Sequence, residues 1–125
     1  MNPYRELGGE AGVRRLVDHF YDRMDESPQA REIRAMHRDE LTEMRERLAL
    51  FLCGWLGGPP LHAQRYGPIC MRSAHAPFPI DSNACDQWIA CMGDALQEAA
   101  IDDKLRDALL GAFARMADML RNRAD

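Results

Sequence analysis

The sequence lacks the features of a membrane or nucleic-acid-binding protein. None of its apolar runs approaches the length of about 18 residues that a membrane span needs. Sixteen Lys and Arg residues against 20 Asp and Glu leave a net charge of −4, and Lys104 is the only lysine. A chain without a basic excess has little counterion release to gain from nucleic acid or an anionic membrane. We therefore expect neither of them among its partners.

Paired cysteines and a leader segment are also missing. No two of the four cysteines, Cys53, Cys70, Cys85 and Cys91, have the two-residue gap of a zinc or redox motif. The first residues, Met1 to Glu6, contain no hydrophobic signal. These two observations predict a cytoplasmic protein with four reduced thiols. The sequence also has no P-loop, Gly-x-Gly-x-x-Gly, His-x-x-x-His or Glu-x-x-His motif, which argues against nucleotide, zinc and di-iron sites.

The sequence does contain a strong helical pattern. Hydrophobic residues make up 46% of the chain, enough for the core of one domain over residues 1–125. Apolar residues recur at helical spacing in four stretches, 13–24, 41–55, 82–96 and 102–120, and Ser27-Pro28 opens a short turn or helix. No stretch alternates like a strand, so we predict an all-α fold. Residues 57–81, with five prolines and three glycines, should be loop with short helical pieces, and so long a loop is usually functional.

His75 is the first candidate for chemistry, because it lies in that loop beside two prolines, Pro77 and Pro79. Its neighbours are neutral or apolar, which favours an uncharged imidazole able to bind a metal. On this pattern alone, a metal ligand and a satisfied structural histidine both remain open. A Cys–His nucleophile is disfavoured, because Cys53 and Cys91 lie within helical patterns typical of buried thiols.

Four motifs occur in the order and spacing of one family: Phe20-Tyr21; Phe51-Leu52 followed by Trp55-Leu56-Gly57-Gly58-Pro59; His75-Ala76-Pro77-Phe78-Pro79-Ile80; and Trp88 with Cys91-Met92. In this combination the sequence resembles the truncated haemoglobins of group II. The resemblance runs from Tyr4 to about Arg121. It implies a two-on-two helical sandwich around haem b (iron protoporphyrin IX).

The resemblance also implies a role for each matching residue. His75 corresponds to the proximal histidine that ligates the haem iron. Tyr21 and Trp88 correspond to the distal donors that point at the bound ligand, and His37 stands where a third member of that cluster is found. The other matching residues would line the ligand cavity (Met44, Leu48), pack on the haem (Phe51, Phe78), or lie at its edge, as propionate partners or plain surface groups (Tyr66, Arg72).

A distal cage of this kind suits a diatomic ligand. Bound dioxygen carries partial negative charge on its outer atom, and the Trp N–H and Tyr O–H groups can donate hydrogen bonds to it. Periodicity alone would also allow Tyr21 and Trp88 to be plain core aromatics. We expect reversible binding of dioxygen, carbon monoxide and nitric oxide, by a monomer or homodimer with a possible reductase partner. The alternatives are an oxygenase or peroxidase acting on nitric oxide or peroxide, and a haem-free helical interaction module.

Two further expectations concern the remaining histidines and the stretch before His75. His19 lies off the apolar face of its helix, and His62 replaces a tyrosine common in the family, so we predict that both lie at the surface. The stretch Gly67 to His75 lacks two arginines and a histidine that relatives often carry. Ala74 and Cys70 stand at the two arginine positions. This departure predicts weaker anchoring of the haem propionates without loss of the iron ligand.

Overall fold

The computed structural model describes residues 2–125, which form helices and connecting loops without any strand. The all-α prediction is therefore confirmed. In chain order the elements are α1 (Pro3–Glu6), α2 (Gly9–Glu26), the 3-10 helix η1 (Pro28–Ala30), α3 (Arg31–Ala35), α4 (Thr42–Trp55), α5 (Leu61–Tyr66), α6 (Met71–His75), α7 (Ser82–Glu98) and α8 (Asp103–Met119). None of the helices described is both long and apolar enough for a membrane span.

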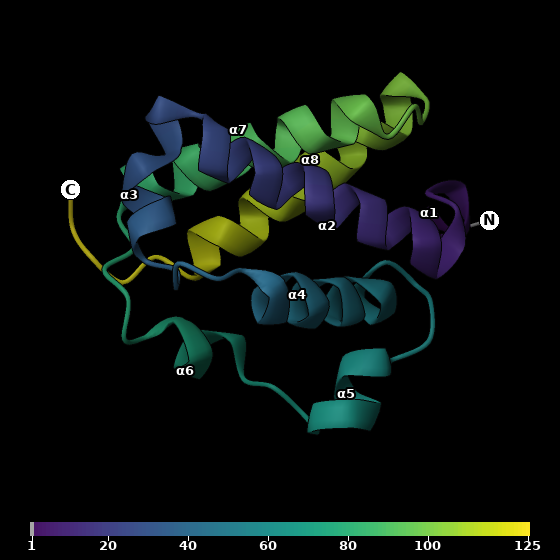
Figure 1. Cartoon of the computed structure of the whole chain (residues 1–125), viewed down its shortest axis with the longest axis horizontal. Coiled ribbons are helices and arrows are strands. Elements are labelled where there is room, and N and C mark those ends of the chain that lie inside the picture. Colours follow the sequence, from purple (N-terminus) through teal and green to yellow (C-terminus); the bar gives the residue numbers. More distant parts are fainter. Residues whose placement is uncertain (1) are drawn as a thin grey trace.

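Two pairs of long helices form the body of the molecule. Helix α2 packs against α4 in one pair, α7 packs against α8 in the other, and α2 joins the pairs through its contact with α7 (Figure 1). Their apolar faces make one core, whose largest fully buried side chains include Phe20, Phe113, Leu16, Leu52 and Met92. This is the expected two-on-two sandwich.

The boundaries of the long helices follow from local chemistry. Asp81 and Asp102 cap α7 and α8, because each carboxylate accepts a hydrogen bond from a backbone N–H of the first turn. The turn after α4 needs glycine twice. Gly57 has a φ of +104°, and a Cβ on Gly58 would lie 2.6 Å from the ring of Tyr4. These glycines end α4 and let the N-terminal segment pack against its end.

The shorter elements were predicted less completely. The 3-10 helix begins at Pro28 as expected, although the Ser27 side chain makes no capping hydrogen bond. Helix α1 was not predicted, even though Asn2 accepts a hydrogen bond from the Arg5 N–H and Pro3 follows it, a typical helix start. Helices α5 and α6 are the short helical pieces expected within residues 57–81.

Helix α6 is set apart from the four-helix body. Helix α5 packs on α4, but no helix of residues 2–125 packs closely along α6 (Figure 1). Residues 67–81 have no buried side chain, although half-buried Ile80 packs against the edge of the core. The segment that carries His75 therefore faces the body without being part of its core.

Candidate functional site

An aromatic cluster joins the residues predicted for the distal side. The ring of Phe20 lies 4.9 Å, centroid to centroid, from both Tyr21 and Trp88, and the Tyr21 ring lies 5.8 Å from that of His37. Tyr21 comes from α2, Trp88 from α7 and His37 from the loop after α3. The fold thus brings three separate elements together around the predicted ligand position.

The donors in this cluster are free to bind something other than protein. Burial raises the pKa of Tyr21 well above its usual range, although the Arg45 guanidinium, 5.7 Å from the ring centre, lowers it in part. Tyr21 therefore keeps its proton at neutral pH. Tyr21 is 3% exposed, and no hydrogen bond within residues 2–125 uses its hydroxyl or the Trp88 indole N–H.

His37 is held in one protonation state by its surroundings. Its Nδ1 lies 2.7 Å from the carbonyl oxygen of Ile33, which can only accept, so Nδ1 carries the proton and Nε2 is left free. Burial lowers the pKa of His37 below its usual range, and the charges of Arg34 and His75 lower it further, against the opposing effect of the Ile33 hydrogen bond. The neutral ring is therefore favoured.

Helix α4 supplies an apolar wall that protein covers only in part. One face, including Leu52 and Cys53, is buried in the core against α2. Met44, Leu48 and Phe51 follow each other at intervals of four and three residues, so they share a second face, and all three are half-buried. A partly covered apolar stripe on a helix of the body suits a flat apolar ligand.

His75 has the arrangement of a metal-ligating histidine. It ends α6, and its Nδ1 lies 2.7 Å from the carbonyl oxygen of Met71, one turn earlier. The carbonyl accepts, so Nδ1–H donates and Nε2 alone is available to a metal. Ligating histidines commonly donate the other ring N–H to a backbone carbonyl, because this bond fixes the ring and its tautomer.

The prediction that His62 lies at the surface is wrong. His62 is 8% exposed, and its Nδ1 is a buried polar atom without a hydrogen-bond partner. Its ring lies 6.3 Å from that of Phe51 and 5.1 Å from that of Tyr66, and these aromatic neighbours bury it. The 62/66 spacing of one helical turn could have signalled this pairing. His19, by contrast, is exposed as predicted.

The other edge residues lie at or near the surface. Tyr66 is half-buried between two arginines, with the Arg47 guanidinium 4.1 Å from its ring centre and that of Arg65 at 5.1 Å. Arg72 is exposed, and Phe78 is exposed by 39% despite its large apolar ring. Positive charge therefore remains near Tyr66, although Ala74 and Cys70 stand where relatives often place arginine.

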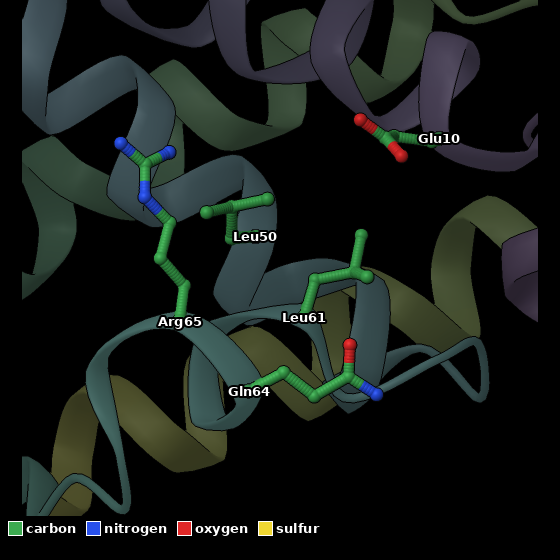
Figure 2. Close-up of a pocket in the computed structure, with 5 residues that line it drawn as sticks. All are labelled: Glu10, Leu50, Leu61, Gln64 and Arg65. Carbon is green, nitrogen blue, oxygen red and sulfur yellow. The ribbon is translucent and has the colours of Figure 1, made fainter.

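One surface pocket lies outside this site, and a second one reaches it at His37. Glu10, Leu50, Leu61, Gln64 and Arg65 line a pocket of about 340 Å³ between the start of α2, α4 and α5 (Figure 2). None of these residues belongs to the predicted site. A second pocket, of about 520 Å³, lies around the end of α2 and α3, and His37 is the only predicted site residue in its lining.

The residues present fit a haem better than a bare metal ion. No group of three His, Cys, Asp or Glu side chains within residues 2–125 could hold an ion. Haem needs only one protein ligand, because the porphyrin supplies the others, together with apolar walls and partners for two carboxylates. His75 offers the ligand nitrogen, α4 the apolar wall, and His62 a buried nitrogen without a protein partner.

Comparison with known proteins agrees with this geometry. The family model of the bacterial-like globins matches residues 2–122, and the chain therefore belongs to that family. The group 2 truncated hemoglobin YjbI of Bacillus subtilis is 33% identical over 123 residues, which are 98% of this chain and 90% of that protein. Within the globins, the chain is accordingly one of the truncated haemoglobins of group II, as the resemblance predicted. The family implies binding of haem and of diatomic gases.

Solved structures give the same result for the fold. The truncated hemoglobin of Pseudoalteromonas haloplanktis TAC125 superposes with a TM-score of 0.95 at 36% identity, covering 98% of this chain and 99% of that one. The group II 2-on-2 hemoglobin of Agrobacterium tumefaciens gives 0.93 at 32% identity, covering 100% and 96%. The likeness extends over at least 96% of each chain compared.

Proposed function

We propose that this chain holds haem b through Nε2 of His75 and reversibly binds dioxygen, carbon monoxide or nitric oxide among Tyr21, Trp88 and His37. One observation carries the proposal. The Nδ1–H of His75 is bound to the Met71 carbonyl, so Nε2 is its available nitrogen. His75 lies on a segment that faces the helical body, where the aromatic donors of the distal cluster have no protein partner. Haem, when bound, supplies the ferrous iron that coordinates the diatomic ligand.

The distal residues would hold that ligand by hydrogen bonds. Tyr21 keeps its proton because it is buried, so its hydroxyl can donate to a partly negative atom. Trp88 can only donate. His37 has Nε2 free and unprotonated, so it would accept from the Tyr21 hydroxyl or a water and thereby orient the cluster. Strong donors slow ligand release, which suits sensing, scavenging or redox chemistry better than bulk oxygen transport.

The haem edge would be held by a mixed set of groups. Phe51, Leu48 and Phe78 would supply apolar contact, while Met44 lines the ligand side. In addition to Tyr66 and Arg72, we propose His62, whose buried Nδ1 lacks a partner and could donate to a propionate. That bond would partly replace the arginines missing before His75.

The setting of this activity follows from the same residues. We also propose a cytoplasmic setting, in which the four free cysteines would stay reduced. Reversible binding requires ferrous iron, so we propose a reductase as the partner.

Ligand-binding spectroscopy tests the proposal. The purified protein is titrated with haemin, reduced, and exposed in turn to carbon monoxide and to dioxygen. We expect one haem to bind per chain, because the chain offers one iron ligand, His75. The spectrum recorded under dioxygen should return to that of the ligand-free ferrous protein when the gas is removed. Failure to bind haemin would contradict the proposal. Rapid consumption of nitric oxide or peroxide with a reductant would instead support the enzymatic alternative.

A further inference from the structure

The segment that follows His75 is held by the C-terminal tail and not by a neighbouring helix. Figure 1 shows the tail, in yellow, lying beside the green segment that joins α6 to α7. After α8 ends, residues 122–125 make a series of hydrogen bonds to residues 75–82. These contacts join parts of the chain more than 40 residues apart, with separations of 42, 43 and 47 for the three side-chain bonds.

Asn122 is the centre of this contact. Its side-chain Nδ2 donates to the carbonyl oxygen of His75 at 3.3 Å, and its Oδ1 accepts from the Ile80 N–H at 2.9 Å. The Ile80 carbonyl accepts from two backbone N–H groups, of Asn122 at 2.9 Å and of Arg123 at 3.1 Å. Asp125 adds a bond from the Ser82 N–H to its carboxylate, at 2.9 Å. One side chain thus binds both the first and the last peptide groups of the turn that follows His75.

These bonds matter because, apart from half-buried Ile80, which packs against the core, no hydrophobic side chain of the segment contacts it. Residues 67–81 have no buried side chain, and no helix of residues 2–125 packs closely along α6. Within α6, the Nδ1 bond to Met71 fixes the ring relative to its own helix but not relative to the body. The position of the ring against the distal cluster therefore depends on what ties its peptide to the rest of the fold.

We propose that Asn122 is a positioning residue for the haem ligand: it holds the His75 peptide and the following turn, and this would fix the direction of Nε2 relative to the helical body. The inference rests on the proposed role of His75. Outer contacts of this kind orient a metal ligand and affect how strongly the metal is held. Losing one such exposed hydrogen bond should accelerate haem loss by a factor of about 2 to 10.

Three variants separate the contacts. Asn122→Ala removes both side-chain bonds. Asn122→Asp keeps an oxygen for the Ile80 N–H but replaces the donor to the His75 carbonyl with a second oxygen. Arg123→Ala is the matched control, because its side chain binds only oxygens of Asn122, while its backbone bond to Ile80 remains.

The readouts are haem transfer to an excess of an apo-globin acceptor and the iron–histidine stretching band of the ferrous, ligand-free protein. We expect both Asn122 variants to transfer haem faster and to show a shifted or broadened band, and Arg123→Ala to behave like the wild type. Amide exchange in the haem-free protein provides a second measurement. The Ile80 amide should exchange faster in Asn122→Ala than in Asn122→Asp.

The outcomes distinguish this inference from the proposed function. Suppose that the wild type shows the iron–histidine band, and that haem transfer, the band and amide exchange are all unchanged in both Asn122 variants. This result would overturn the role of Asn122 and leave that of His75 intact. Equal effects of Arg123→Ala and Asn122→Asp would also overturn it, because the whole tail would then be acting. Absence of the band from wild type would overturn both proposals.

Discussion

Helix α2, which carries Tyr21, has seven buried residues, whereas the segment 67–81, which carries His75, has none. Aromatic packing holds the distal side: Tyr21, Phe20, Trp88 and Phe113 follow one another at centroid distances between 4.9 and 5.6 Å. Hydrogen bonds from the tail and within α6 hold the proximal side. The fold and the cofactor bond therefore depend on different parts of the molecule, and substitutions can separate them.

The sharpest separation is expected for the iron ligand. His75→Ala should abolish haem retention, because the metal loses its only protein bond. The haem-free variant should still unfold at the wild-type temperature, since His75 packs in no core. Haem content after purification and the thermal unfolding of the haem-free protein are the two measurements. His19→Ala, at an exposed position on α2, is the control and should change neither. A His75→Ala protein with full haem and an unchanged spectrum would show that another residue is the ligand.

The reverse separation is expected in the core. Leu52→Ala, at a fully buried site on α4, should lower the unfolding free energy of the haem-free protein by about 2–5 kcal/mol. Phe78→Ala, at a site 39% exposed, should change it by no more than about 0.5 kcal/mol. Urea unfolding followed by circular dichroism measures both. Comparable losses would mean that the proximal segment belongs to the cooperative core after all.

Within the distal side, the donors can be distinguished from the packing. Trp88→Phe keeps a ring against Phe20 but removes the N–H, so dioxygen should dissociate roughly tenfold faster or more, since a hydrogen bond to a partly charged acceptor contributes about 1.5–3 kcal/mol. Carbon monoxide, a poor acceptor, should dissociate almost unchanged. Trp55→Phe is the control, because Trp55 also stacks on Phe113, at 4.7 Å, outside the distal cluster. Equal effects on both gases would indicate a packing role.

The smallest effect is expected at the haem edge. Ala74→Arg, at an exposed position of α6, restores a cation that relatives often carry, and it should slow haem transfer by a factor of a few. Added salt should reduce the gain. Ala108→Arg, exposed on α8, controls for net charge. If transfer at low salt is unchanged, His62, Tyr66 or Arg72 holds the propionates without help from position 74.

The sequence predicted the long helices well, because their apolar spacing and the carboxylates at Asp81 and Asp102 are local signals. The pairing of those helices and the gathering of Tyr21, His37 and Trp88 came from family resemblance, since periodicity alone cannot tell a cage from a core. Two features were missed for the same physical reason. His62 is buried by Phe51 from another helix, and Asn122 bonds to residues more than 40 positions away, so neither leaves a repeating pattern in the chain.

The lack of buried side chains in residues 67–81 has a consequence for how the protein acquires its cofactor. Swinging this segment outward would break a few hydrogen bonds and would lift one half-buried hydrophobic side chain, Ile80, off the core. Openings of that kind lie at the low end of the free energies over which proteins open locally. We therefore expect the helical body to fold without the contacts of this segment, so that haem could enter or leave while the body stays folded.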